Sequence, residues 1–419
     1  MKKYEEILEH HLRTGYFSQE FGSRYHYILS PKPFICDPFI KNQIDEIGSA
    51  VSAYLKGSEF FLKDKDHCSN NMVSSLRGSI ISQTGFPSYE GNYRVPLCKV
   101  DVMVDTSNRL KIAEIDAYNP RGIAFAAFIK DVYKEYTKHS FFLGAEQSLV
   151  QEVIKKDCSK IIWPYAHHER FYEIVFKQLT RIVLNKYSIE INPYDTDTFA
   201  FNKNTDGAIF TMIPWGMRTP REVTFAQPML YSLYKRNPEQ FLYSPTPWLG
   251  NKALMGFVSN GAGQNLEVEN ILGKYYTQKE LSLIRKYFPE TILVGKRFKD
   301  DVHTFLNKHN SSVLKANISS GLKGVWVYDS IEDLNKNSKI NSFIQEKKAN
   351  YTLQEFINQK KFQLETYSGK NNTLRTDDWY LRMTLHIDTK GVVVDAEITG
   401  RKTPDVHGAP DCIQMPCVF

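Results

Sequence analysis

The sequence lacks the long apolar run of a membrane span. No stretch of its 419 residues approaches the roughly 18 uninterrupted apolar positions that such a helix needs. The first residues, MKKYEEILEHHLR, are charged and follow a helical pattern, so the apolar core of a signal peptide is also missing. We therefore expect no membrane partner and a cytoplasmic protein.

Zinc and disulfide signatures are missing as well. The six cysteines, at positions 36, 68, 98, 158, 412 and 417, are scattered and form no CxxC pair. This usage favours a reducing compartment over a disulfide framework. His167 and His168 are adjacent and cannot easily share a metal ion from one helix face, and no partner ligands lie at suitable spacing.

Familiar nucleotide and nucleic-acid motifs are absent too. No Gly-Lys-Ser/Thr opens a helix, and GAGQN at 261–265 lacks the third glycine and the preceding strand of a dinucleotide fingerprint. The net charge of +6 is mild for this length, and Lys and Arg are spread thinly. These features argue against a nucleic-acid partner, whereas a basic surface around a nucleotide pocket explains the charge equally well.

The chain has the composition of a globular protein, with 42% hydrophobic and 13% aromatic residues. Its length suits two or three domains, or one composite domain. Strands and helices alternate over 159–236, which predicts an α/β layer with a parallel sheet. Apolar residues at helical spacing predict an amphipathic helix over 38–63, with Phe39 and Phe60 interpreted as packing residues. We place an N-terminal α/β region at 1–240 and a second region at 241–419.

An acidic hairpin is predicted between residues 98 and 120. Residues 100–104 and 110–115 read as strands joined by a Thr-Ser-Asn turn. Glu114 and Asp116 are two residues apart and share one face, and a hairpin can bring Asp101 to the same face. Three carboxylates together call for a cation, and Mg²⁺ on nucleotide phosphates prefers such oxygen ligands. The alternative is a polar sheet face with salt bridges to Lys99 or Arg121.

A second hairpin is predicted from Ser312 onward. A strand leads to Lys315, and a second strand covers Val325–Tyr328. Ser319, Ser320, Gly321 and Gly324 form the turn between them. A lysine at a strand end followed by a glycine-bearing turn suits a triphosphate, because glycines let backbone N–H groups approach the anion. The alternative is an ordinary hairpin with a solvated lysine.

Three further segments carry possible ligand contacts. Asn251 can cap a helix that starts at Lys252, whose charge opposes the helix dipole, so this lysine is either exposed or faces an anion. Arg382 lies mid-strand in a hairpin predicted over 379–398, and a buried arginine needs a phosphate or a carboxylate. The segment 343–347 is predicted to be an extended hinge between lobes that could bind an adenine edge.

These pieces together resemble the ATP-grasp carboxylate–amine ligases, and most closely the circularly permuted branch that includes glutathionylspermidine synthase. That family carries an Asp on one strand and Glu-Tyr-Asn-Ala-Asp-Thr-Pro on the next, whereas this chain has Asp101 and then Glu-Ile-Asp-Ala-Tyr-Asn-Pro at 114–120. The acidic hairpin precedes Lys315, which is why the permuted order applies. Lys99 stands where the family has an arginine, and no amidase domain is present.

The resemblance implies an α/β fold in which two lobes sandwich ATP, and a ligase that forms an amide through an acyl phosphate. It implies ATP and Mg²⁺ as cofactors, and a small carboxylate and an amine as substrates. By resemblance, the metal ligands are Asp101, Glu114 and Asp116, the nucleotide contacts are Lys252, Lys315, Ser319, Ser320, Gly321, Gly324, Gln345 and Glu346, and the catalytic arginine is Arg382. Lys296 and Arg401 are further candidates.

Two other functions stay open at this point. A small-molecule kinase would use the same lysines and metal and would stop after phosphate transfer. A non-catalytic module that binds nucleic acid would show strongly salt-dependent binding and no nucleotide affinity. The sequence contains no readable code for the acid, for the amine (an amino acid, a short peptide or a polyamine) or for the oligomeric state.

Overall fold

The structure is a computed structural model that describes most of the chain. The described residues are 28–64, 76–77, 80, 94–117, 122–165, 173–195, 207–210, 226–244, 247–259, 266–318, 324–328, 338–346, 349–368, 373–406 and 411–419. Within them, no helix combines the length and the apolar character needed to cross a bilayer. The fold is mixed α/β, as predicted, with three sheets.

The largest sheet has eight strands that come from both ends of the described chain. Its main path runs β1-β15-β14-β13-β3-β4, with β2 added beside β15 and β12 beside β13. The strands are β1 (Ile28–Leu29), β2 (Phe34–Ile35), β3 (Leu97–Val104), β4 (Leu110–Asp116), β12 (Lys361–Ser368), β13 (Thr373–Asp388), β14 (Val393–Arg401) and β15 (Ile413–Val418). The predicted hairpins 100–115 and 379–398 are both confirmed. The division near residue 240 stays a prediction, and this sheet takes strands from both sides of it.

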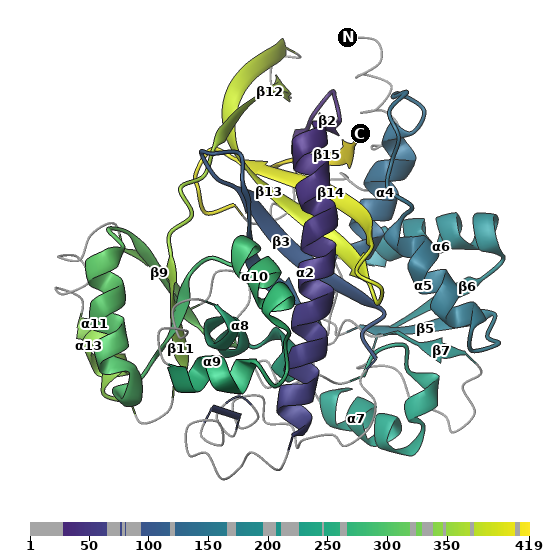
Figure 1. The fold of residues 1–419 in the computed structure, drawn as a ribbon. Helices are drawn as coiled ribbons and strands as arrows, with labels where there is room; N and C mark the ends of the chain where they lie inside the picture. Colours follow the sequence, from purple (N-terminus) through teal and green to yellow (C-terminus); the bar gives the residue numbers. More distant parts are fainter. Residues whose placement is uncertain are drawn as a thin grey trace.

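Helix α2 (Pro38–Lys63) runs across one face of this sheet (Figure 1). Asp37 caps it by accepting a hydrogen bond from the backbone N–H of Ile40 at 2.8 Å, which satisfies a donor that the helix leaves open. Its fully buried Ile44 belongs to the same apolar cluster as Val100 and Leu385 of the sheet.

The predicted apolar stripe of α2 is confirmed, but two of its aromatic residues were misplaced. Phe39 is 56% exposed and Phe60 is 53% exposed, so interpreting them as packing residues is wrong. Each is followed in the sequence by an apolar residue that is buried, Ile40 and Phe61. Because neighbouring helical positions point about 100° apart, Ile40 and Phe61 face the apolar interior while Phe39 and Phe60 point outward.

A separate three-stranded sheet confirms the predicted parallel layer. Its order is β6-β5-β7, and both pairings are parallel. The strands are β5 (Lys160–Tyr165), β6 (Glu190–Asp195) and β7 (Ala208–Ile209), and the accompanying helices are α4 (Ile123–Tyr133), α5 (Ala145–Ile154), α6 (Glu173–Tyr187) and α7 (Ala226–Arg236). Helices α4 and α5 also contact β14, so this unit lies against the central sheet.

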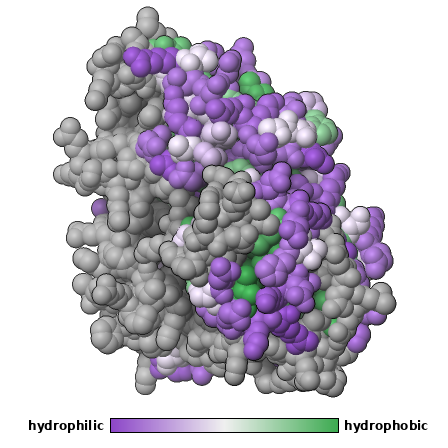
Figure 2. All heavy atoms as spheres, turned by 90° about the vertical axis from the view of Figure 1, so that its left-hand side faces the viewer, coloured by the Kyte–Doolittle hydropathy of each residue, from purple (hydrophilic) through white to green (hydrophobic). Residues whose placement is uncertain are grey.

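The third sheet forms a lobe on the other side of the molecule (Figure 1). Its order is β10-β9-β11-β8, from β8 (Thr291–Val294), β9 (Ser312–Ala316), β10 (Val325–Tyr328) and β11 (Tyr351–Glu355). The helices of this part are α8 (Lys252–Val258), α9 (Leu266–Leu272), α10 (Gln278–Tyr287), α11 (Lys299–Lys308) and α13 (Ser338–Ile344), and single 3-10 turns lie at Pro238–Gln240, Pro247–Gly250 and Lys296–Phe298. The coloured part of this side of the molecule is mainly hydrophilic (Figure 2). The predicted hairpin from Ser312 to Tyr328 is confirmed.

The predicted hinge strand at 343–347 is wrong. Phe343 and Ile344 end helix α13, and Gln345 lies in the turn that follows. Phe343 stacks on Tyr351 with ring centroids 3.8 Å apart, and Ile344 is buried in the core of this same lobe. The two apolar residues thus pack on one helical turn. The chain passes from this lobe to the central sheet later, between β11 and β12.

The two ends of the described chain meet at a pair of thiols. Cys36 directly follows β2, whose parallel partner β15 contains Cys417. Their sulfur atoms lie 2.8 Å apart, and both residues are buried. In the strand register Cys417 is opposite Phe34, two residues before Cys36, so the two thiols approach each other diagonally across β2 and β15.

We therefore expect that treating the purified protein with oxidised glutathione will link Cys36 to Cys417. Peptide mapping under non-reducing conditions should recover the linked pair, because no other arrangement of β2 and β15 brings these residues together. The Cys98→Ser variant is the control, since the Cys98 sulfur lies near the carbonyl oxygen of Lys99 and should leave the link unchanged. Recovery of Cys36 and Cys417 only as separate thiols would contradict this strand pairing.

Candidate active site

The face of the central sheet opposite α2 is lined with polar side chains. Residues on β3 and β13 alternate, so Val100 and Leu385 pack with α2 while Asp101 and Thr384 point to the other side. Strand register places Thr384 between Asp101 of β3 and Glu397 of β14, and Asp101 is opposite Glu114 of β4. One row of polar residues therefore crosses four adjacent strands.

Asp101 is the most heavily bound of these acids. It is 4% exposed and accepts hydrogen bonds from Thr384 Oγ1 at 2.8 Å and from Lys99 Nζ at 3.1 Å. The guanidinium of Arg382 lies 3.5 Å from the same carboxylate. Burial disfavours the charged form, but Arg382, Lys99 and the Thr384 hydroxyl outweigh it and lower the pKa of Asp101 to about 2. Asp101 is therefore an anion that compensates two buried cations.

Glu114 is paired with Lys252, which comes from the neighbouring lobe. The ammonium of Lys252 lies 3.1 Å from Glu114 Oε1. Lys252 opens helix α8, as predicted, and Asn251 caps it by accepting from the N–H of Ala253 at 2.9 Å. Burial opposes ionisation of Glu114, yet Lys252 and Lys99 hold its pKa below the ordinary value. Lys252 is 7% exposed, so it faces an anion and not the solvent.

Lys315 of β9 contacts the same hairpin from the lobe that contains β8 to β11. Its ammonium donates to the carbonyl oxygen of Ala113 at 3.1 Å and to Gln354 Oε1 at 2.6 Å. Burial, and then repulsion by Lys252, lower the pKa of Lys315 to about 8. Neither of the two oxygen atoms that accept a hydrogen bond from Lys315 carries a full negative charge. Lys252 is buried, Lys315 is half-buried, and Lys315 has no ion pair of its own with Glu114 or Asp101, so the two lysines favour a further anion.

The remaining predicted residues lie as follows. Asp116 is half-buried and opposite Lys99 in the strand register, on the face that also carries Glu114. Gly324 directly precedes β10 with φ at +71°, a backbone conformation that favours glycine. Ser319, Ser320 and Gly321 lie outside the described residues.

Two of the predicted ligand contacts, Glu346 and Arg401, make hydrogen bonds or ion pairs with other residues of the protein. The carbonyl oxygen of Glu346 accepts from the backbone N–H of Lys296 at 2.8 Å, and the N–H of Glu346 donates to Phe343. Arg401 pairs with Asp411 at 3.1 Å and with Asp405 on an exposed loop. The nucleotide contacts of Gln345 and Glu346 stay predictions, now for a turn and not for a strand.

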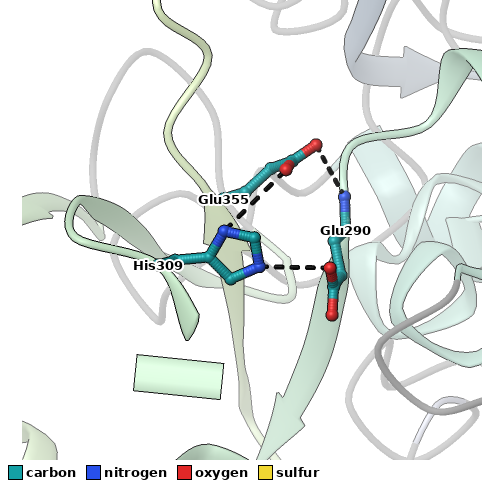
Figure 3. Close-up of side chains that lie close together, drawn as sticks. All are labelled: Glu290, His309 and Glu355. Carbon is teal, nitrogen blue, oxygen red and sulfur yellow. Dashed lines mark hydrogen bonds and ion pairs between the residues drawn. The ribbon is translucent and has the colours of Figure 1, made fainter. Parts of the chain in front are cut away.

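A compact group of potential metal ligands lies elsewhere. Among the described residues, three such atoms fall within 4.8 Å of one another only at Glu290, His309 and Glu355 (Figure 3). There, His309 Nε2 lies 3.1 Å from Glu290 and Nδ1 lies 4.0 Å from Glu355, so both ring nitrogens face carboxylates. Lys308 also pairs with Glu290 at 2.6 Å. This arrangement is an ion-pair cluster that ties α11 to β8 and β11.

Sequence reasoning missed Thr384, His386 and Glu397 of the polar face. Their signal was available, because polar residues recur at every second position in Arg382-Met-Thr-Leu-His386 and in Asp395-Ala-Glu397. This alternation is typical of strands with one polar face.

Comparisons with known proteins give a structural match only. No family model matches this chain, and no curated protein matches. Among solved structures, a glutathione synthetase-like effector from Globodera pallida, in its apo form, superposes with a TM-score of 0.55. The match covers 99% of this chain and 97% of that chain at 11% identity. The chain therefore has a glutathione synthetase-like, ATP-grasp fold.

We expect Asp101→Asn to destabilise the protein, because Lys99 and Arg382 would stay charged without their shared anion. Removing one partner of a buried ion pair costs about 3–5 kcal/mol. The folded-state pKa of about 2 lies below the value of about 4 for an unfolded Asp, so the stabilisation is present above pH 4 and is lost as the pH falls through 2.

Urea unfolding at several pH values measures both effects, and the variant should lose this part of the acid sensitivity. Asp45→Asn is the matched control, since its pair with Lys41 is largely exposed on α2 and should contribute about 0.5 kcal/mol. Equal losses in the two variants would show that Asp101 does not hold the buried cations.

Proposed function

We propose that this protein is an ATP-dependent carboxylate–amine ligase that forms an amide bond and releases ADP and phosphate. One observation carries the proposal. Lys252 and Lys315 come from a different lobe than the acidic hairpin, yet both reach it, Lys252 at Glu114 and Lys315 at the carbonyl oxygen of Ala113. A shared position for these cations is what a nucleotide triphosphate needs, and the ATP-grasp-like fold supports it. The acidic hairpin precedes the lysines, which supports placing the chain in the circularly permuted branch.

The lysines would bind the phosphates of ATP. Lys252 is buried and Lys315 is half-buried, so a phosphate between their ammonium groups would lie in a medium where charge attraction is stronger than in water. Burial and then repulsion by Lys252 lower the pKa of Lys315, and a bound phosphate would supply compensating negative charge.

The acidic hairpin would hold the proposed Mg²⁺ once its carboxylates draw together, since among the described residues three potential ligand atoms lie within 4.8 Å of one another only at Glu290, His309 and Glu355. Asp101, Glu114 and Asp116 offer the carboxylate oxygens that this ion prefers, and they face one side of β3 and β4. The ion would neutralise phosphate oxygens. In the structure, Glu114 is bound by Lys252 and Asp101 by Lys99, so these residues would share their carboxylates between lysine and metal.

Arg382 would stabilise charge on the transferring phosphoryl group. It lies on β13 beside β3, and its side chain is mostly buried and 3.5 Å from Asp101. A carboxylate resists attack because it is negatively charged, and phosphorylation converts one oxygen into a leaving group. An amine then attacks the acyl carbon, and phosphate leaves. The protein positions the reactants and balances their charge. Such a reaction fits the ATP supply of the cytoplasm.

We expect Lys315→Ala and Glu114→Ala each to lower substrate-dependent ADP release by about 10²–10³-fold, the usual cost of losing one charge-stabilising contact. The assay uses pools of carboxylic acids and amines, with mass detection of the coupled product. Lys390→Ala is the control, because this exposed lysine lies in the turn between β13 and β14, away from the polar face. Full activity in both variants would refute the site, and an amine-independent phosphorylated product would identify a kinase.

Binding of MgATP near pH 8 should draw a proton into the protein. Free Lys315 titrates at about 8, so a part of it is neutral there, and an adjacent phosphate would raise its pKa. Calorimetry in buffers of different ionisation enthalpy should report this uptake for the wild type and lose it in Lys315→Met. Binding of MgATP without proton uptake at this pH would exclude contact between Lys315 and the phosphates.

A further inference from the structure

Glu397 of β14 is a buried acid that the proposed reaction has not yet used. It is 7% exposed and lies on the polar face of the central sheet. Its Oε2 atom is buried and has no hydrogen-bond partner. Among the described residues, no lysine or arginine lies within ion-pair distance of it, whereas Asp101 and Glu114 of the same row are both paired.

The position of Glu397 relates it to the proposed phosphate site. It is opposite Thr384, whose hydroxyl donates to Asp101. With strands about 4.8 Å apart, Glu397 is about 10 Å from the Asp101 strand position and about 14 Å from that of Glu114. Arg382 lies on the strand between. The row therefore has a cation-rich end at β4 and an uncompensated acid at β14.

The backbone of Gly122 packs closely against Glu397. A Cβ atom at Gly122, just before α4, would lie 3.2 Å from Glu397 Oε1 and 3.5 Å from His386 Nε2. Gly122 has φ at +110°, so a side chain is disfavoured there on conformational grounds as well. Residue 122 thus lies next to two buried polar side chains, Glu397 and His386, and adds no side chain of its own.

The neighbouring acid on β14, Asp395, is a buried carboxylate that has hydrogen-bond donors for both of its oxygen atoms. Asp395 accepts from the N–H of Ala396 at 2.9 Å and from the N–H of Ala145 at 3.1 Å. Glu397 lacks such donors, and burial, together with the nearby Asp395, raises its pKa to about 8 against the pull of Arg382. A buried acceptor without a partner is costly, and a cationic ligand removes that cost.

We propose that Glu397 binds the ammonium group of the amine substrate, in a subsite bordered by His386 and Gly122. This inference rests on the proposed ligase function and names the chemistry of one substrate, a protonated primary amine. The amine would enter at the β14 side and the ATP phosphates at the β4 side. The activated carboxylate would lie between them, near Arg382. Because a protonated amine has no lone pair, the ammonium would first give one proton to the Glu397 carboxylate; the neutral amine then attacks the acyl carbon and phosphate leaves.

The test compares two nucleophiles in the variant Glu397→Gln, which keeps the side-chain shape and removes the charge. Hydroxylamine is mostly uncharged at neutral pH and traps an acyl phosphate as a hydroxamate without needing an ammonium site. We expect Glu397→Gln to retain hydroxamate formation, while its KM for the charged amine rises by at least about tenfold, as for other buried charge pairs. Glu397→Asp should recover part of the loss.

The control Glu365→Gln removes a partly exposed acid on β12 of the same sheet, and its amine KM should stay unchanged. If the wild type is active and Glu397→Gln has an unchanged amine KM, the subsite is refuted while the ligase function stands.

If the wild type forms neither hydroxamate nor ADP, the ligase function fails, and direct binding then decides the subsite. In that case 1,4-diaminobutane should raise the Tm of the wild type and not of Glu397→Gln, with 1,4-butanediol as the uncharged probe. Equal shifts for both proteins would overturn the proposal.

Discussion

The ion pairs that hold Asp101 are the constraint on which the rest of the site depends. Asp101 is buried between Lys99 and Arg382, and isolated charges at such a depth would each cost several kcal/mol. Strand alternation makes the arrangement possible, because it gives the central sheet one apolar face for α2 and one face for charge. The apolar face supplies the packing energy that fixes the strands, and the fixed strands then hold the charges at hydrogen-bond distance.

Local sequence patterns predicted the helices and strands that carry the site better than they predicted which residues contact one another. The acidic hairpin, the Asn251 cap and the strand that carries Lys315 were predictable, because alternation and capping act over a few residues. The bond from Thr384 to Asp101 joins residues 283 positions apart, and no local pattern encodes it. The segment at 343–347 failed for a related reason, since two adjacent apolar residues suit a strand and a helical turn equally well until their packing partner is known.

The structural match explains why motifs were more informative than overall similarity. A chain that shares 11% identity with its structural neighbour retains the course of nearly the whole backbone. What such a fold requires is the sequence of apolar and polar faces, which many residue combinations satisfy. The candidate site involves fewer positions, and they gather where the lobe of β8–β11 meets the acidic hairpin.

The central sheet also has a consequence for how the molecule is made. Its β3–β4 hairpin is synthesised early, whereas β13, which covers the open edge of β3, follows more than 250 residues later, as the separation of 283 positions between Asp101 and Thr384 shows. At a translation speed of about 5–20 residues per second, the nascent hairpin waits on the order of 15–60 s for that partner. An unpaired strand edge can join another nascent chain during this interval, and charged residues such as Lys99 and Asp101 hinder such pairing. The same charges that bind in the mature site would then protect the chain while it is still on the ribosome.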